Sequence, residues 1–479
     1  MSLEKGLHFL ALFLLTAAAA LAQLGSGTIS GTVTDPAGAL VSGAAIEIRN
    51  VGTNAVFRTT SNAQGFYTAP GLPVGNYAVT ASMQGFKRLV RSGITLQVDQ
   101  KAVVDFSLEL GAVAESIEVV GQAALVDTSS ATVGKVVENR RVQELPLNGR
   151  NALALMLLAP GVRSNAAVSS GFGDRGVEVT SVSINNGPSA MNGQVLDGGN
   201  NIQTYLGEIN MNPAVDAVEE FKVQTNTMSA EFGFTAGGVV NLVTKSGTNE
   251  FHGTLYHFLR NDKLDARNTF AAVRAPFRYN QFGGALGGPL SIPKVYDGKN
   301  RTFFFYNFES WYFRRAVNPI GSTPIDTWRR GDFSNFLNDR GQQIPIFDPD
   351  TLRREGSQVF RTQFPGNVIP QSRLDPTTVA FLRYMPPPNR TPVNPFTQQN
   401  NFISSFSEGR EMQQHTGKVD HRFSDKNYFY GRYTFYRHFT NAGNLQSPWP
   451  DPMVRARLDD LRNNNFVIND THSFAPNLL

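Results

Sequence analysis

Hydrophobic and polar residues alternate with a period of two along much of the chain, which is the pattern of half-buried β-strands. Between residues 27 and 110 the alternation comes in short runs bounded by turn sequences, namely Asp35-Pro36-Ala37-Gly38, Asn62-Ala63-Gln64-Gly65 and Pro73-Val74-Gly75-Asn76. Short strands joined by tight turns are typical of a small β-sandwich. We therefore predict a β-sandwich over residues 27–110.

The pattern between Thr128 and Thr244 is mixed, and both helices and strands are expected there. Short helices are predicted at Val136 to Leu145 and at Asn151 to Leu158, the second ended by Pro160-Gly161. Strands are predicted around Gly, Asn and Ser loops, at Val177 to Ile184, Gln194 to Leu196, Glu219 to Gln224 and Gly238 to Val243. The turn Lys245 to Asn249 ends this α+β region.

After that turn the alternating segments become longer and richer in aromatic residues. In the sequence RTFFFYNFESWYF the aromatic residues Phe304, Tyr306, Phe308 and Tyr312 share one face, whereas Asn307 and Glu309 share the other. One lipid-facing and one wet face would give this alternation in a transmembrane β-barrel. We expect about six such strands, starting near Phe251, Tyr279, Arg301, Gln413, Asn427 and Asn464.

The connections between these strands differ in length. The strand with Phe429, Tyr433 and Phe435 on one face, and Arg432 and Thr434 on the other, follows the short turn Ser424 to Asn427. Arg437 falls on its apolar face near the far interface, where an outward Arg costs only about 0 to 1 kcal/mol.

A Pro-rich segment of about 100 residues separates the third and fourth strands, far longer than an ordinary connection. One small helix is expected in it, from the cap Asp375 and Pro376 to Met385. Long outer loops and short inner turns fit a barrel. A soluble β-protein with a Pro-rich insertion is the alternative.

Composition narrows the functional classes. The 479 residues exceed one ordinary domain, only 17% are charged, and 35 are Phe. The net charge of +4 comes without a basic cluster interleaved with aromatics, so no nucleic-acid partner is expected. Cys is absent, which excludes disulfides, thiolate metal sites and Cys nucleophiles within this sequence.

The N-terminus predicts export. Lys5 precedes the apolar run Leu7 to Leu21, and Ala20-Leu21-Ala22 has the form of a signal-peptidase site. Residues 1–22 are therefore interpreted as a removed Sec signal peptide, with a membrane anchor as the alternative. No other stretch has the ~18 apolar residues of a spanning helix, so insertion into a membrane would use a β-barrel.

Two sequence strings carry a family resemblance in the predicted sandwich. GTISGTVTDPAGALVSGAAIEIRN and SNAQGFYTAPGLPVGNYAVTASMQGF resemble the carboxypeptidase regulatory-like domain, which implies a prealbumin-like, carbohydrate-binding-like fold. No residue points to catalysis or sugar binding, so a structural or docking role is favoured over sugar binding.

ELPLNGRNALALMLLAPGV, VLDGGNN and residues 214–259 resemble, in this order, the plug of TonB-dependent receptors, with the Oar-like subgroup nearest. IFDPDTLRREG, FPGNVIPQSRLDP and MPPPNR resemble the barrel region of that subgroup. The resemblance implies a plug over residues 115–248 and the start of a barrel over residues 249–479. A plugged barrel needs about 22 strands, so we expect this sequence to be a fragment.

Two sets of residues are predicted to carry function. The first resembles the TonB box, an extended segment that would pair with a periplasmic motor protein, and comprises Glu115, Ser116, Ile117, Glu118, Val119, Val120 and Gly121. The alternative is that this segment is the last strand of the sandwich or a linker. The second is a loop at the plug apex, either a plain turn or a ligand contact, and comprises Asp197, Gly198, Gly199, Asn200 and Asn201.

Other motifs give no site. Residues 171–176 match G-x-G-x-x-G but lack the flanking strand and helix of a dinucleotide site. The His residues show no metal-ligand spacing, and no carboxylate pair or nucleophile is indicated. We therefore predict no catalytic residue, cofactor or metal.

The sequence predicts a bacterial outer-membrane TonB-dependent receptor or transporter, in contact with membrane lipid and energised through a TonB-type motor. Its extracellular ligand, a carbohydrate or a peptide, is not indicated by any residue. A surface adhesion or secretion-linked protein and a secreted carbohydrate-binding module are the alternatives.

Overall fold

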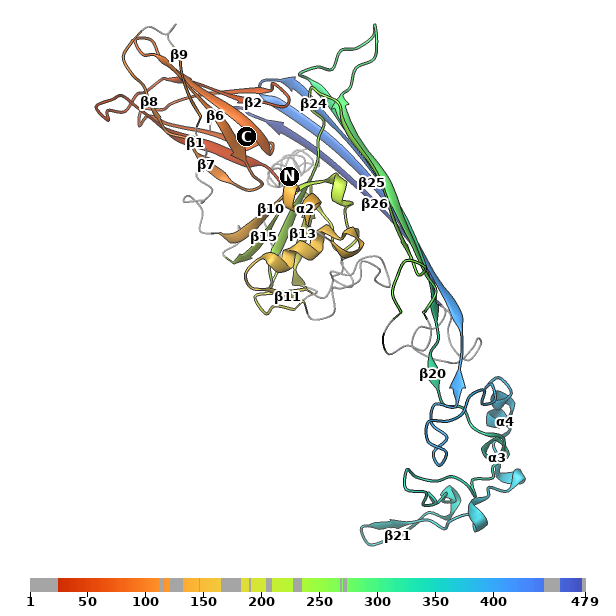
Figure 1. Cartoon of the computed structure of the whole chain (residues 1–479). Coiled ribbons are helices and arrows are strands. Elements are labelled where there is room, and N and C mark those ends of the chain that lie inside the picture. Colours follow the sequence, from red (N-terminus) through yellow and green to blue (C-terminus); the bar gives the residue numbers. More distant parts are fainter. Residues whose placement is uncertain are drawn as a thin grey trace, which may run out of the picture.

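The computed structural model is mainly β and is shown in Figure 1. It describes residues 25–111, 116–120, 132–145, 147–164, 182–188, 191–203, 209–226, 235–267, 269, 274–442 and 457–475. Three parts are named below: the sandwich (residues 25–120), the inner domain (residues 132–245) and the wall, whose six strands lie between residues 252 and 472.

The sandwich consists of two sheets. One contains β1 (Gly27–Thr34), β4 (Phe66–Leu72), β7 (Lys101–Val103) and β8 (Phe106–Ser107). The other has the order β3-β2-β5-β6-β9 and contains β2 (Ala45–Asn50), β3 (Val56–Thr60), β5 (Gly75–Ser82), β6 (Arg88–Leu96) and β9 (Ser116–Val120). Alternate residues are buried along β1, and Ile29, Ile48 and Tyr77 belong to one apolar core. The predicted β-sandwich is confirmed.

The inner domain is built on the sheet β10-β15-β16-β13-β14. Its strands are β10 (Val133–Glu138), β13 (Gly193–Leu196), β14 (Gly199–Asn200), β15 (Val218–Asn226) and β16 (Val239–Thr244), with the separate pair β11 (Val162–Ser164) and β12 (Val182–Ile184). Its helical segments are α2 (Asn139–Glu144), η1 (Asn148–Arg150), η2 (Ala152–Leu158) and η5 (Val215–Ala217).

One helix prediction in this domain is partly wrong. Val136 to Glu138 form a strand that pairs with Lys222 to Glu220 of β15, and only Asn139–Glu144 is helical. The paired neighbour β15 decides the conformation here, because the β-branched Val136 and Val137 suit a strand. The second predicted helix is confirmed as a 3₁₀-helix capped by Asn151, whose side chain accepts a hydrogen bond from the Leu153 N–H. In the predicted strand at 177–184, residues 177–181 lie outside the described residues.

The wall is one antiparallel sheet in sequence order. Its strands are β17 (His252–Asn261), β18 (Phe277–Pro289), β19 (Thr302–Val317), β24 (Phe406–Ser424), β25 (Asn427–Ala442) and β26 (Arg457–His472). The six predicted strands are confirmed, although β24 and β26 begin at Phe406 and Arg457 rather than near Gln413 and Asn464. No helix among the described residues is long and apolar enough to span a membrane.

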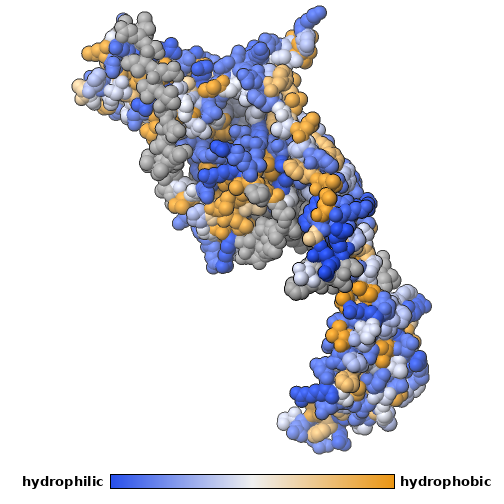
Figure 2. All heavy atoms as spheres, in the orientation of Figure 1, coloured by the Kyte–Doolittle hydropathy of each residue, from blue (hydrophilic) through white to orange (hydrophobic). Residues whose placement is uncertain are grey.

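The two faces of the wall differ as the alternation predicts. Asn307, Glu309 and Arg432 are buried on the face that meets the inner domain, whereas Tyr306 and Tyr433 are exposed on the other face. Figure 1 shows the inner domain lying beside the wall strands, and Figure 2 shows hydrophobic side chains along the visible edge of the wall. At one end, called the turn end, the turn at Asp425 and Lys426 joins β24 to β25, and residues 290–301 join β18 to β19. The long connection of residues 318–405 leaves from the other end, called the loop end.

Residues 318–405, called the outer-loop unit, form a separate lobe beyond the loop end in Figure 1. They contain α3 (Asp326–Arg329), α4 (Pro376–Leu382), the strand pairs β20 (Ile320–Gly321) with β23 (Phe402–Ile403) and β21 (Arg353–Glu355) with β22 (Gln358–Phe360), and the turns η6 (Pro349–Thr351), η7 (Pro365–Asn367) and η8 (Gln371–Arg373). The predicted cap is confirmed, because Asp375 accepts a hydrogen bond from the Thr378 N–H at 2.7 Å. The helix ends at Leu382 rather than Met385, and tighter turns follow, in which the Tyr384 and Met385 N–H groups donate three residues back.

Candidate functional site

The turn between β13 and β14 is fixed to the end of β16 by Asp197. This residue has a φ of 46°, a left-handed conformation that Asp tolerates well. The carboxylate accepts hydrogen bonds from the Thr244 N–H at 2.9 Å and from the Thr244 hydroxyl at 2.6 Å. The Asp197 N–H donates to the Leu242 carbonyl at 2.9 Å, so the turn has one defined position.

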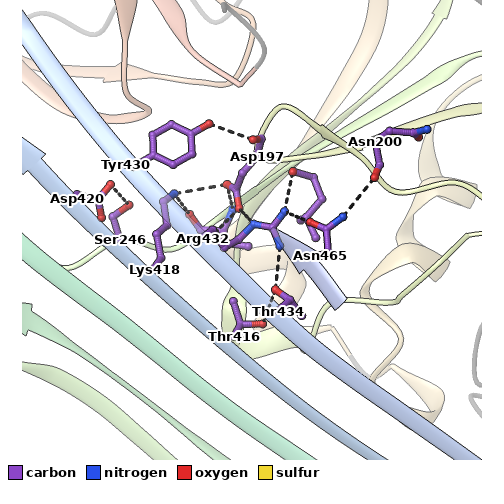
Figure 3. A network of polar contacts seen from close by, with 12 residues as sticks. Asp197, Asn200, Ser246, Thr416, Lys418, Asp420, Tyr430, Arg432, Thr434 and Asn465 are labelled. Carbon is purple, nitrogen blue, oxygen red and sulfur yellow. Dashed lines mark hydrogen bonds and ion pairs between the residues drawn. The ribbon is translucent and has the colours of Figure 1, made fainter. Parts of the chain in front are cut away.

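Two cations of the wall reach the same carboxylate, as Figure 3 shows. Arg432 Nε of β25 lies 2.8 Å from Asp197 Oδ2, an ion pair that is not aligned as a hydrogen bond. Lys418 Nζ of β24 lies 3.4 Å from Oδ1 and donates to the Thr244 carbonyl at 3.2 Å. Asp197, Lys418 and Arg432 are only 2%, 5% and 0% exposed. Burial alone would raise the pKa of Asp197, but Lys418, Arg432 and Thr244 together hold it below its ordinary value.

Arg432 extends this contact across the turn. Its guanidinium donates to the Leu196 carbonyl at 3.0 Å, to the Asn465 side chain at 2.6 Å and to the Thr434 hydroxyl at 2.8 Å. Tyr430 donates its hydroxyl hydrogen to the Asp197 carbonyl at 3.0 Å. The planar guanidinium has several donors in fixed directions, so it specifies the position of the turn on the wall.

The predicted loop Asp197 to Asn201 thus lies against β25 and β26. A Cβ added at Gly199 would come within 2.6 Å of the Val467 side chain, so the close approach of turn and wall favours glycine. Asn201 is buried and donates to the Gln194 side chain at 2.9 Å and to the Met211 carbonyl at 2.8 Å. Asn200 is exposed, and contact of this loop with a ligand stays a prediction.

A second polar contact with the wall centres on Arg150, a residue that sequence reasoning did not single out. Arg150 forms an ion pair with Asp216, and its Nε lies 3.8 Å from Glu309 Oε2 of β19. Its guanidinium carbon lies 4.5 Å from the centre of the Tyr256 ring, and the Tyr256 hydroxyl donates to Glu309 at 2.7 Å. The sequence feature that could have pointed to Arg150 is its position between the turn-forming Asn148-Gly149 and an apolar run, where it is the one charged residue.

The predicted motor segment is placed in the sandwich. Ser116–Val120 form β9, which pairs in parallel with Arg88 to Ser92 of β6 at the edge of the sheet. This placement matches the alternative interpretation, in which the segment is the last strand of the sandwich. Glu115 and Gly121 lie outside the described residues, and contact of the segment with a motor protein stays a prediction.

The remaining motifs add no chemistry. In the part of the chain that the structure describes, no three His, Asp or Glu side chains gather in a way that could hold a metal ion. The glycine motif at 171–176 lies outside the described residues. Ser246, next to the inner domain, donates its hydroxyl hydrogen to Asp420 Oδ1 of β24 at 3.3 Å. The arrangement can fix one domain to another.

Comparison with known proteins places this architecture. Residues 243–479 match the outer membrane beta barrel domain, and residues 28–109 match the carboxypeptidase regulatory-like domain. The TonB-dependent transporter Oar of Myxococcus xanthus is 30% identical over 330 residues. The chain is a homologue of this transporter. It is therefore an outer-membrane β-barrel protein of bacteria that carries an N-terminal β-sandwich, which confirms the resemblance, the fold class and the location predicted from the sequence.

The match covers 64% of this chain but only 29% of the Oar transporter, so the chain spans about a third of that relative. Among solved structures, the ferric enterobactin receptor PfeA of Pseudomonas aeruginosa is similar at 15% identity with a TM-score of 0.38, over 72% of this chain and 39% of that chain. The outer membrane transporter YddB of Escherichia coli is similar at 10% identity with a TM-score of 0.37, over 64% of this chain and 33% of that chain.

Proposed function

We propose that the full-length protein is a TonB-dependent receptor or transporter and that the inner domain is its plug. The homology to a TonB-dependent transporter supports the class. The observation that carries the plug assignment is the fastening of the inner domain to the inner face of the wall, through Asp197 with Arg432 and Lys418. A domain held inside a barrel by such contacts would block passage until it moves.

The chemistry of this fastening suits a domain that moves. Two buried charges lose hydration when they pair, so a buried ion pair adds little net stability compared with well-packed apolar groups. The same charges regain hydration when the two surfaces separate. The contact can therefore specify one closed position of the inner domain. Breaking it costs less free energy than breaking an apolar contact of equal area.

The turn end of the wall would face the periplasm and the loop end the cell exterior, because barrels of this kind have short inner turns and long outer loops. The unidentified ligand would meet the outer-loop unit and the remaining outer loops. Because the Asp197 carboxylate is buried, the loop Asp197 to Asn201 would respond to ligand through its wall contacts. Energy would come from a TonB-type protein that binds Glu115 to Gly121 by strand addition.

The test is binding of the purified periplasmic domain of the host TonB-type protein to the full-length receptor in detergent. We expect binding to intact receptor, and a loss of about tenfold or more in affinity, or about 1.4 kcal/mol, when Glu115 to Gly121 is deleted. A matched control replaces the same segment by a Gly/Ser linker of equal length. Equal binding by all three receptors would exclude the proposed motor contact.

The folded outer-loop unit favours one second candidate, a protein that displays this lobe for surface adhesion. Asn367 is fully buried there and donates to the carbonyls of Phe333 at 2.8 Å and Ile344 at 2.9 Å, so the lobe has its own structure. An adhesion protein would keep its surface role when residues 115–121 are deleted, and its binding to cells or matrix would be lost when residues 318–405 are removed.

A further inference from the structure

One four-residue loop of the sandwich contacts three strands of the inner domain. The loop Gln97 to Gln100 follows β6, and its residue Asp99 has a φ of 51°. Asp99 Oδ2 accepts hydrogen bonds from the Gln224 side chain at 3.0 Å and from the Asn241 side chain at 2.9 Å. The Asp99 carbonyl accepts a hydrogen bond from Lys222 Nζ at 2.9 Å. A single residue is thus held by donors from β15 and β16.

The residues beside Asp99 complete this contact. The Val98 N–H donates to Glu220 of β15, and the Gln97 side chain donates to Glu138 of β10 at 3.0 Å. Asn241 is fully buried, and Glu220 is 7% exposed. Gln97, Val98 and Asp99 thus each form a hydrogen bond with the inner domain, which is the pattern of a specific interface. The side-chain oxygens of Gln224 and Asn241 are buried there without a hydrogen-bond partner among the described residues.

The sandwich also touches the turn end of the wall, through the β2–β3 hairpin. Asn54 donates to Asn300 Oδ1 at 3.0 Å, and the Gly52 carbonyl accepts from the Asn249 N–H at 3.0 Å. Arg58 forms an ion pair with Asp425, in the turn between β24 and β25. The sandwich therefore bridges the inner domain and the wall.

A cavity of about 350 Å³ lies where these three parts meet. Its lining includes Tyr77 of the sandwich, Glu219 and Thr244 of the inner domain, and Asp420 and Tyr428 of the wall. The presence of all three parts around one cavity shows that the sandwich spans the seam between the inner domain and the wall.

We propose that the sandwich is a latch that holds the inner domain in its closed position at the turn end of the wall, with Asp99 as its contact residue. The proposal rests on the proposed function, since opening means movement of the inner domain. The contacts described above are polar, and polar groups regain hydrogen bonds with water when such a latch releases.

The position of β9 links the latch to the predicted motor segment. β9 pairs with Arg88 to Ser92 of β6, and β6 leads directly into the loop that carries Asp99. A pull on Glu115 to Gly121 would act on β6 through their shared hydrogen bonds. The same pull would act on the inner domain through residues 121–132. One motor protein would then pull on both the latch and the inner domain.

The latch can be tested by cross-linking in the full-length protein. These 479 residues contain no Cys, and any Cys elsewhere in the protein would be replaced by Ser. Asp99→Cys and Asn241→Cys are combined, and a specific protease site is placed within residues 121–131. Cells are treated with a short, thiol-cleavable bis-methanethiosulfonate reagent, either energised or with a protonophore. After cleavage, a cross-linked chain stays in one piece on a non-reducing gel.

We expect most chains to be cross-linked in protonophore-treated cells and fewer in energised cells. The matched control combines Asn241→Cys with Asp105→Cys, because Asp105 is bound within the sandwich by Thr32 at 2.7 and 2.8 Å. It is expected to give two pieces. Because Asn241 is buried, a second pair, Gln97→Cys with Glu138→Cys, tests the same contact at a half-buried and an exposed position.

Absence of cross-links for both pairs in protonophore-treated cells would overturn the latch. Equal cross-linking in energised and protonophore-treated cells would contradict the claim that the latch opens when the cells are energised. The cross-link in protonophore-treated cells needs no motor protein, so a failure of the proposed motor contact would appear as lost TonB binding with this cross-link unchanged.

Discussion

Arg432→Met tests the ion pair between the inner domain and the wall. Met has a similar length but no charge and no donor, so Asp197 would keep its two hydrogen bonds from Thr244 and only the longer contact to Lys418 at 3.4 Å. Removing one partner of a buried pair costs roughly 3–5 kcal/mol. Because Lys418 still compensates part of the charge, we expect the lower limit, about 3 kcal/mol.

Amide hydrogen exchange of the full-length protein reports this energy at the contact itself. The Asp197 N–H donates to the Leu242 carbonyl and the Thr244 N–H to the Asp197 carboxylate, so both amides are protected only while the turn is in place. A loss of about 3 kcal/mol corresponds to exchange faster by roughly 100-fold. In the double variant Arg432→Met with Asp197→Asn, no carboxylate is left without its Arg, and we expect a large part of the protection to return.

The matched control for this experiment is Arg437→Met on the same strand. Arg437 faces away from the inner domain and pairs with Asp460 at 2.8 Å, with both side chains partly exposed. Such exposed pairs contribute about 0–1 kcal/mol, and exchange of the Asp197 and Thr244 amides should not change. If Arg432→Met leaves both amides protected, or if its effect simply adds to that of Asp197→Asn, the ion pair does not fasten the inner domain.

Three further predictions concern other contacts. Burial raises the pKa of Glu220 to about 8. The negative charges of Glu219, Glu138 and Asp99 raise this pKa further, whereas the hydrogen bond from the Val98 N–H lowers it. The cation at this contact is Lys222, which donates to the Asp99 carbonyl. Since this pKa lies above the ordinary value of 4.5, the contact is stabilised at low pH and weakened as the pH rises through about 8. The Asp99–Asn241 cross-link should therefore decline as the pH rises from about 4.5 to about 8 and level off above that, and Glu220→Gln should abolish this dependence. Arg150→Met would leave Asp216 and Glu309 buried without their cation and should cost about 3 kcal/mol, seen as faster exchange of the Ala217 amide, whereas Arg150→Lys should cost less. Asn367→Ala removes two donors and the acceptor of the Ile346 N–H, and should destabilise the outer-loop unit by about 2–3 kcal/mol, measured as faster proteolysis within residues 318–405 while the wall stays intact.

The strands were predictable because a period of two needs no knowledge of distant partners. The side-chain alternation around Asn307 and Arg432 assigned both residues to the face opposite the lipid before any pairing was known, and the structure buries them on that face. The prediction failed where a neighbour decided between two local possibilities, as at Val136 to Glu138, which β15 draws into a strand. Periodicity also left strand ends uncertain, since β24 and β26 extend beyond the segments with clear alternation.

The contact site could be predicted only in parts. The sequence indicated an inward Arg432 and a turn at Asp197, yet the two lie far apart in the chain and no local pattern joins them. Their pairing depends on the register of β24 and β25 and on the position of the inner domain. Arg150 was missed for the same reason, because its partners Asp216 and Glu309 come from two other segments.

The interface between the inner domain and the wall is not uniform along the strands. Toward the loop end, Tyr279, Trp311 and Met412 of the wall join the apolar core of the inner domain. Toward the turn end, the contacts include the charged groups of Asp197, Lys418 and Arg432, and the apolar contact is the smaller cluster of Phe305 with Ala214 and Ala217. Apolar groups lose their stabilisation in water, whereas separated charges regain hydration. A force applied from the turn end would therefore separate the polar contacts first, while the apolar half still holds the domain, so that opening would begin at the end where the sandwich sits.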